Sequence, residues 1–282
     1  MARPGPAILG VALVVLAFSG SLLAAEKYDG VYGSGKLQLV LATGSPGELG
    51  LVEALSVAFA RKADVTVKWK KAGTGSGLRL LKQKKIDLIL AHDPAAEKAA
   101  VQEGWAARRE LVGSNEFWIV GPVADPARIA SAITADAALR KIAAKQARFF
   151  SRGESSGTHE RELLIWKAAK ISPSGAWYRP TKSFMKETLK RASDEQGYTI
   201  TDNSTWLMEE ASRRDLKVLF RGGPLLLNSY HALCRPGTDD HARTASRFID
   251  FMVSPEGQAV VGEYGKARFG LPLYNDAART KQ

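Results

Sequence analysis

The stretch DVTVKWKKAGTGSGLRLLKQKKIDLILAHDPAAEKAAVQEG, residues 64–104, decides the fold class. It joins two β-rich runs through a glycine-rich turn and a short basic helix, and a second helix follows with Pro94 in its first turn. The run KLQLVLAT before it also leads through a glycine-containing turn into a helical pattern. A strand, turn and helix repeated three times predict parallel β-α-β units and an α/β fold. The expected strands cover 36–43, 64–69 and 86–92, and the expected helices cover 51–63, 78–84 and a segment that begins near Pro94.

The second half of the chain continues the alternation and contains two long apolar strands. NEFWIVGP (115–122) leads out of the first units, and LLLNSYHALCRP (225–236) returns to them. We therefore expect two α/β lobes, the second inserted into the first, with these strands crossing between them. A closing helix is broken at Ser254 and Pro255. The expected limits are 26–119 with 228–282 for the first lobe and 120–227 for the second, with helices over 125–146, 159–170 and 185–197.

The composition is that of a basic globular protein. The 282 residues are 45% hydrophobic and 24% charged, and the formal net charge is +11. Basic residues form only two short runs, KWKK (68–71) and KQKK (82–85), and the interleaved aromatic residues that stack bases are absent. We expect no nucleic-acid partner, which leaves small anions and anionic membranes as the classes that the charge favours.

Residues 1–25 have the pattern of a secretory signal peptide. Arg3 precedes the uncharged run PGPAILGVALVVLAFSGSLLAA, whose small residues predict cleavage near Ala24 or Ala25. An uncleaved membrane anchor is the alternative, because the apolar run is long. No cysteine lies at this boundary to carry a lipid, and Cys234, the only cysteine, has no partner for an intramolecular disulfide. We expect an exported, soluble mature protein.

Three loops of similar composition each follow a predicted strand and precede a predicted helix. Glycines turn backbone N–H groups toward a ligand, helix starts add unpaired donors, and hydroxyls add further donors. Arg152 supplies the one full positive charge. Because ligands of open α/β sheets bind at the carboxyl ends of strands, the loops predict an anion site, although helix capping alone explains each loop taken singly. The candidate ligand-binding residues are Thr43, Ser45, Gly73, Thr74, Gly75, Arg152, Ser155, Ser156 and Thr158.

Several segments from about Leu39 to Leu273 carry a family resemblance. They include KAGTGSGLRLL, DLILAHDPAAEKAAVQEGWAARRELVGSNEFWIVGP, FFSRGESSGTHERELLIW and YTITDNSTWL, of which the SRGxxSGTH run is the most specific. In these segments the chain resembles the tungstate-binding periplasmic proteins, the substrate-binding subunits of tungstate ABC importers. The resemblance implies a type II periplasmic binding protein fold, in which two Rossmann-like lobes are joined by two crossing strands.

The resemblance also implies roles for residues of the candidate site. In the family, an arginine in the SRGxxSGTH run and hydroxyl or amide donors from both lobes hold the oxyanion. The matching positions here are Arg152, Ser155, Ser156, Thr158, Gly73, Thr74 and Gly75.

Two segments depart from the family pattern. ATGSP (42–46) keeps only two hydroxyls where the family has a run of threonines ending in serine. KSFMK (182–186) stands where the family has Gly-Gln-Gly-Met-Gly. Two expectations follow: either Lys182 or Lys186 replaces the lost donors with a charge, or Phe184 fills part of the pocket. The ligand expected from the resemblance is tungstate or molybdate, and phosphate, sulfate or a small organic acid are alternatives.

Other functional classes have weaker support. The histidines at 92, 159, 231 and 241 lack the spacing of metal ligands, and Ser156 with His159 has the spacing of a helix cap. We therefore expect no metal, no cofactor and no enzymatic activity. The expected protein is a periplasmic monomer whose partners are a small oxyanion and an ABC importer permease. A ligand-sensing module for a membrane signalling protein is the alternative.

Overall fold

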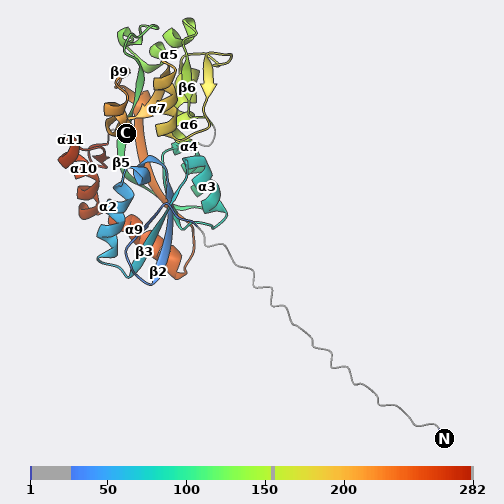
Figure 1. The fold of residues 1–282 in the computed structure, drawn as a ribbon. Coiled ribbons are helices and arrows are strands. Elements are labelled where there is room, and N and C mark those ends of the chain that lie inside the picture. The colour runs from blue at the N-terminus through green and yellow to red at the C-terminus, as the bar shows by residue number, and fades with distance from the viewer. Residues whose placement is uncertain (2–26, 154–155, 281–282) are drawn as a thin grey trace.

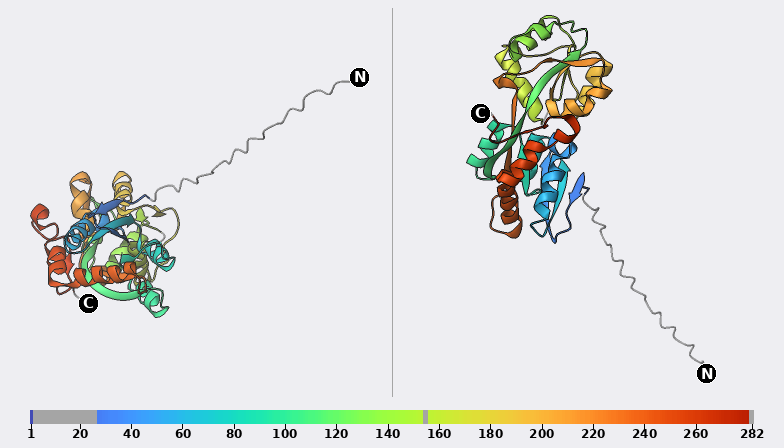
Figure 2. Two further views of the ribbon diagram at one scale, coloured as in Figure 1. Left: turned by 90° about the horizontal axis from the view of Figure 1, so that it is seen from below. Right: turned by 90° about the vertical axis from the view of Figure 1, so that its left-hand side faces the viewer.

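The computed structural model describes the chain outside residues 2–26, 154–155 and 281–282 (Figure 1). The predicted signal peptide, apart from Met1, and the predicted ligand residue Ser155 therefore lie outside the described residues. Within the part of the chain that is described, no helix has the length and apolar character needed to cross a membrane. The described chain forms an elongated molecule with helices on both sides of a central sheet (Figure 2).

Residues 30–102 form the β-α-β units that the sequence predicts. Their elements are β1 (Gly30–Tyr32), β2 (Leu37–Thr43), α1 (Ser45–Glu48), α2 (Leu51–Ala60), β3 (Val65–Lys71), α3 (Thr74–Lys82), β4 (Leu88–Ala91) and α4 (Pro94–Gln102). β2 pairs in parallel with β3 on one side and with β4 on the other, and β1 is antiparallel to β3. We call β1–β4 the first strand group. The prediction of a helix from Leu78 was wrong at its start, because the GTGSG segment forms the first turn of α3.

Two long antiparallel strands continue the sheet toward the second half of the molecule. They are β5 (Ala107–Pro122) and β10 (Leu227–Cys234). β5 begins at Ala107, eight residues before the expected 115–122. It pairs with β10 as far as Glu116, and from Phe117 onward it pairs with strands of the second half instead. Both strands therefore connect the two halves, and they run lengthwise through the middle of Figure 1.

The second half contains another set of strands with helices around it. Its elements are η1 (Ile129–Ser131), α5 (Ala135–Ala144), β6 (Phe149–Ser151), α6 (Gly157–Ala168), β7 (Tyr178–Pro180), α7 (Met185–Asp194), β8 (Tyr198–Asp202), α8 (Asn203–Glu209), η2 (Glu210–Ser212), β9 (Leu216–Phe220) and η3 (Pro224–Leu226). β6 lies between β7 and β8, parallel to both, and β8 and β9 are antiparallel to β5. We call β6–β9 the second strand group. The helix expected over 125–146 was too long, because Arg128 has a left-handed backbone and only a short 3-10 turn precedes α5.

The C-terminal segment returns to the first strand group. It forms α9 (Asp240–Val253), α10 (Pro255–Glu263), α11 (Lys266–Phe269) and β11 (Asn275–Asp276). The predicted break is confirmed, since Ser254 ends α9 and its hydroxyl caps α10 by accepting from Gly257 N. Phe248 stacks on Phe59 of α2 with ring centroids 4.6 Å apart, which joins the two ends of the chain in one core.

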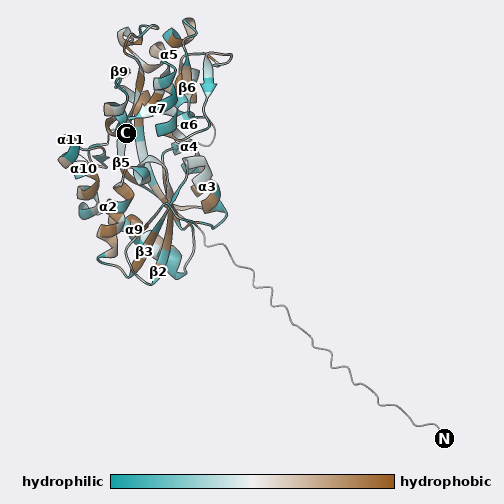
Figure 3. Cartoon of the chain, viewed as in Figure 1, coloured by the Kyte–Doolittle hydropathy of each residue, from teal (hydrophilic) through white to brown (hydrophobic). Residues whose placement is uncertain are grey.

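Separate apolar clusters lie under the two strand groups. The main cluster of the first half contains residues such as Leu39, Leu55 and Phe248. The main cluster of the second half contains residues such as Ile119, Phe149 and Trp166. Figure 3 colours most of the central strands as hydrophobic, whereas β7 at the edge of the sheet is hydrophilic.

Candidate functional site

Loops from the two strand groups meet between the halves of the molecule. Ser45, which follows β2, donates a hydrogen bond from its hydroxyl to Asp202 Oδ2 at the end of β8, 157 residues away in the chain, at 3.2 Å. His92, which follows β4, packs against Gly157 at the start of α6, where a Cβ would stand 2.6 Å from ring atoms Cε1 and Nε2. The predicted loops at 43–45 and 151–158 therefore lie at one place, and only a glycine fits beside the His92 ring.

Arg152 lies at this meeting point, directly after β6. Its Nε is buried and has no hydrogen-bond partner among the described residues. Burial lowers the pKa of Arg152, while the carboxylates of Asp202, Glu48 and Glu187 oppose that shift. A buried donor without an acceptor is unusual in folded proteins, and a charged one carries a larger penalty. Arg152 is thus suited to pair with an anion that enters from outside the chain.

Two helices begin at the site and direct their N-termini toward it. α3 starts at Thr74 after an extended Gly73, and α6 starts at Gly157 after Ser156. The first turn of a helix leaves backbone N–H groups without an intrahelical acceptor and carries the positive end of the helix dipole. The Ser156 hydroxyl accepts from His159 N at 3.4 Å, as expected of a cap. Thr158 is buried in the same turn.

Three hydroxyls at or just before the starts of α1 and α3 already have partners in the protein. Thr43 Oγ1 donates to Leu90 O at 3.0 Å, so this hydroxyl fastens β2 to β4. Thr74 Oγ1 accepts from His92 N at 3.3 Å and leaves its own hydrogen for another acceptor. Ser45 donates to Asp202. The three predicted hydroxyl residues are therefore held in place, and Ser45 reaches across to the second strand group.

Asp202 is a site residue that the sequence reasoning did not identify. The side chain is 2% exposed. Its Oδ1 accepts from Thr205 N at 2.9 Å and from the Ser204 hydroxyl, and its Oδ2 lies 2.8 Å from Thr205 Oγ1. With Ser45 added, both carboxylate oxygens are hydrogen-bonded. The sequence signal for Asp202 was its place within the polar TDNST run (201–205) that follows a predicted strand, which is typical of a helix cap.

His92 was recognised in the sequence only as a poor metal-ligand candidate. Its Nδ1 lies 2.9 Å from Asn228 Oδ1 on β10. Asn228 Nδ2 donates to Asn115 Oδ1 and to Tyr230 Oη, so the amide oxygen of Asn228 accepts and His92 Nδ1 carries the hydrogen. Burial lowers the pKa of His92, and this effect exceeds the opposing effects of the Asn228 hydrogen bond and of Asp202 and Glu97. A neutral imidazole therefore fills the space between the two halves.

The KSFMK segment contributes an aromatic ring to the site. The Phe184 ring centroid lies 4.0 Å from Lys71 Nζ and 5.2 Å from the guanidinium carbon of Arg152. Lys186 faces elsewhere, because its Nζ lies 3.7 Å from Glu209 Oε1, and Lys182 is exposed beside an outer cavity with Pro180 and His159. Of the residues proposed for this segment, the ring is the one that the structure brings to Arg152.

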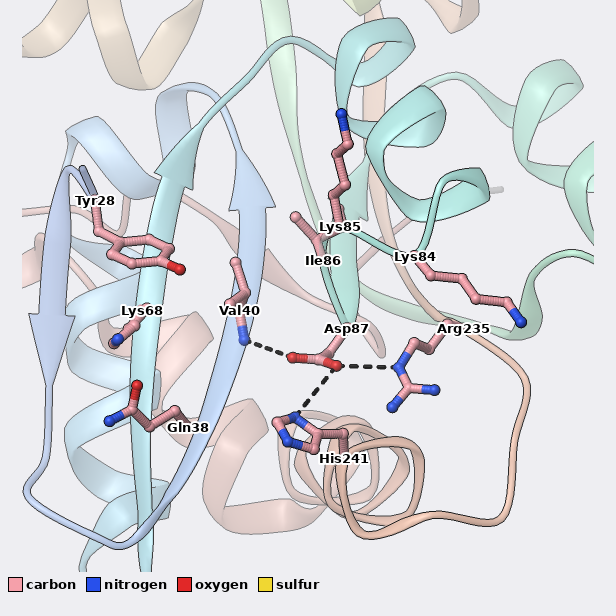
Figure 4. Close-up of a pocket in the computed structure, with 10 residues that line it drawn as sticks. All are labelled: Tyr28, Gln38, Val40, Lys68, Lys84, Lys85, Ile86, Asp87, Arg235 and His241. Carbon is pink, nitrogen blue, oxygen red and sulfur yellow. Dashed lines mark hydrogen bonds and ion pairs between the residues drawn. The ribbon is translucent and has the colours of Figure 1, made fainter. Parts of the chain in front are cut away.

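A separate hollow of about 380 Å³ lies at the opposite end of β4 (Figure 4). Asp87 at its centre accepts from Val40 N at 2.8 Å and from Arg235 Nε at 3.1 Å, and His241 Nδ1 lies 3.5 Å from the same carboxylate. These charged groups satisfy one another. The hollow is therefore distinct from the loop site, and its charges tie β2, β4 and the segment after β10 together.

Comparisons with known proteins agree with this architecture. The model of the PBP superfamily domain matches residues 30–256. The tungstate-binding protein TupA of Peptoclostridium acidaminophilum is 33% identical over 249 residues, which cover 86% of this chain and 87% of that protein. The solved structure of the tungstate ABC transporter from Geobacter sulfurreducens has a TM-score of 0.74 and 35% identity, covering 82% of this chain and 100% of that chain. The tungstate-binding protein TupA from Desulfovibrio alaskensis G20 has a TM-score of 0.69 and 35% identity, covering 85% of this chain and 98% of that chain.

The expected fold class is confirmed by these structures, whose fold is the two-lobe α/β fold of periplasmic binding proteins. The match of the superfamily model and the identity to the curated relative cover most of the chain. The chain therefore belongs to the PBP superfamily and, within it, to the family of tungstate-binding proteins.

Proposed function

We propose that this chain is the substrate-binding subunit of an ABC importer and that it captures a small oxyanion of the tungstate and molybdate class. The observation that carries the proposal is Arg152, which follows β6 in the loop before α6 and whose buried Nε is unpaired among the described residues. An oxyanion supplies the missing acceptor, and charge-assisted hydrogen bonds of this kind are about twice as strong as neutral ones. The tungstate-binding relatives favour this anion class.

The binding residues in this proposal come from both strand groups. Arg152, Ser155, Ser156 and Thr158 act from one lobe, and Ser45, Gly73, Thr74 and Gly75 act from the other. Thr43 supports that lobe by fastening β2 to β4, because its hydroxyl hydrogen is donated to Leu90 O. The lobes are 26–119 with 228–282, and 120–227. The ligand is enclosed when the lobes close about β5 and β10, as in hinge closure of binding proteins. Enclosure requires that donors replace the water around a dianion, and two helix starts, hydroxyls and one guanidinium provide them.

The chain binds its ligand without a cofactor and without chemical conversion, acts as a monomer in the periplasm after removal of the 1–25 leader, and delivers the ligand to a membrane permease. The tungstate ABC transporter from Geobacter sulfurreducens supports the permease as partner.

Isothermal titration of the purified mature chain against tungstate, molybdate, sulfate and phosphate tests the function. We expect tungstate or molybdate to bind, and Arg152→Ala to lose about 2–4 kcal/mol of binding free energy because a buried charge partner is removed. Arg140→Ala is the matched control, since that side chain is 47% exposed and pairs with Asp136 on α5. Binding of no oxyanion by the parent, or equal binding by Arg152→Ala, would show that the proposal is wrong.

A further inference from the structure

Phe184 lies between two cations that belong to different halves of the molecule. Lys71 ends β3 of the first strand group, and Arg152 follows β6 of the second. The ring centroid is 4.0 Å from Lys71 Nζ and 5.2 Å from the guanidinium carbon of Arg152. Both distances are within the range in which an aromatic ring attracts a cation, and the attraction strengthens when water is excluded. The ring thus links the two strand groups at the rim of the loop site.

The partners of Phe184 are themselves held in place. Lys71 Nζ lies 2.6 Å from Glu48 Oε1, and the two side chains are 23% and 13% exposed. Phe184 O accepts from Thr188 N at 3.0 Å and from Thr188 Oγ1 at 3.1 Å, which fixes the backbone at the start of α7. Met185, the next residue, is fully buried. The Lys71 ammonium and the Phe184 ring therefore meet without the freedom of two surface side chains.

Arg152 has a particular need for the Phe184 ring. Its Nε makes no hydrogen bond among the described residues, so that nitrogen does not fix the plane of the guanidinium. A ring beside the guanidinium carbon limits the directions that the side chain can take. Held in this way, the guanidinium is oriented before an anion arrives, and less freedom is lost on binding.

We propose that Phe184 is a positioning residue for the oxyanion site, which orients Arg152 and, through Lys71, holds the two lobes closed over the ligand. This inference rests on the proposed function and adds to it a residue that sets the lifetime of the complex. Loss of the ring lets the lobes separate and frees Arg152, so release of the anion is accelerated more than its capture. Among variants of one binding site, most changes in affinity appear in the dissociation rate.

Stopped-flow fluorescence with tungstate and molybdate as probes tests the proposal on Phe184→Leu and Phe184→Tyr. Leucine keeps an apolar side chain but removes the ring, and tyrosine keeps the ring face. We expect Phe184→Leu to raise the dissociation rate about tenfold with an association rate within about twofold of the parent, a size typical of cation–π contacts. Phe184→Tyr should restore the parental dissociation rate. Phe269→Leu is the matched control, because that ring lies 5.1 Å from the guanidinium carbon of Arg268 on α11.

Equal dissociation rates for the parent and Phe184→Leu, or for Phe184→Leu and Phe184→Tyr, would overturn the positioning role while the oxyanion function stands. If the parent binds no oxyanion, the proposed function fails. Spin-label distances in the ligand-free protein then test separately whether Phe184 holds the two lobes closed. Labels at Lys98→Cys on α4 and Lys167→Cys on α6, both exposed positions, are placed in a Cys234→Ser background. We expect Phe184→Leu to lengthen the distance between the labels. An unchanged distance would contradict the inference that the Phe184 ring holds the lobes closed.

Discussion

The Ser45 hydroxyl donates its hydrogen to Asp202 Oδ2 across the boundary between the two strand groups, at 3.2 Å. Asp202 is buried, and it is the first of the carboxylates that oppose the lowering of the pKa of Arg152. If the proposed site holds an oxyanion, the anion and Asp202 compete as acceptors for Ser45 and as counter-charges for Arg152. The proposal therefore predicts that the Asp202 carboxylate weakens binding of the anion.

Asp202→Asn should tighten oxyanion binding. The substitution removes a negative charge near the anion, while asparagine keeps the shape and the ability to cap α8. We expect a dissociation constant about tenfold lower for a dianion, or about 1.4 kcal/mol, measured by isothermal titration with molybdate. Asp93→Asn, which changes the cap of α4 in the same way, is the control. Weaker binding by Asp202→Asn would instead mean that the carboxylate keeps Ser45 in its binding position.

Neutralising the lysines of the KSFMK segment should leave binding almost unchanged. Lys186 pairs with Glu209 at 3.7 Å, and Lys182 is exposed. Ion pairs that remain in contact with solvent contribute little, and solvent screens an exposed charge such as that of Lys182 from a buried ligand. We expect Lys182→Gln and Lys186→Gln each to change the dissociation constant for tungstate less than about twofold at low and at high salt. A marked loss of affinity confined to low salt would show that a lysine reaches the bound anion.

The fold was predictable to a large extent because its signals are local. Alternation of apolar runs with glycine-rich turns gave β2, β3 and β4 near their observed positions, and the Ser254–Pro255 break followed from a cap beside a proline. The predicted ends of helices were wrong where one local pattern is compatible with two structures. The GTGSG segment reads equally well as a loop or as a first helical turn, and α3 uses it as the turn.

The candidate site was only partly predictable, because the sequence shows loops and hydroxyls but not which groups face each other. The place of Arg152 after a strand and before a helix followed from residue type and position, whereas the start of α3 was expected too late in the chain. Asp202, Phe184 and Lys71 matter only through contacts between segments far apart in the chain, such as the 4.0 Å contact of Lys71 with the Phe184 ring. No local pattern encodes those pairings.

Stability should fall as the pH is lowered through the histidine range, in part because of His92. Burial lowers the pKa of His92, so the unfolded chain binds a proton near pH 6.5 while the folded chain binds it only at lower pH. The unfolded state then holds more protons, and the free energy of unfolding decreases as the pH drops below about 6.5. At higher pH the neutral ring carries no such penalty.

The variant His92→Asn isolates this contribution. Asparagine keeps a donor near the position of Nδ1, which faces Asn228, and does not titrate. We expect urea unfolding between about pH 5 and 7.5 to show a slope that is smaller than that of the parent by up to about 1.4 kcal/mol per pH unit. Equal slopes for the parent and His92→Asn would contradict the assignment.

Closure of the two lobes should depend on the absence of a side chain at Gly157. A Cβ there would stand 2.6 Å from two atoms of the His92 ring, and that ring is fixed by its 2.9 Å contact with Asn228. Alanine favours the helical backbone of α6 by about 1 kcal/mol over glycine, so Gly157→Ala should not weaken folding of the lobe itself. The overlap must then be relieved by separation of the two loops. We expect Gly157→Ala to bind molybdate at least about tenfold more weakly, because donors from both loops no longer reach one anion.

The double variant His92→Ala/Gly157→Ala removes the overlap, so the loss caused by Gly157→Ala should be much smaller in the His92→Ala background than in the parent. Calorimetric titration of the four proteins measures both losses. If they are equal, contact with His92 is not what makes glycine necessary at this position.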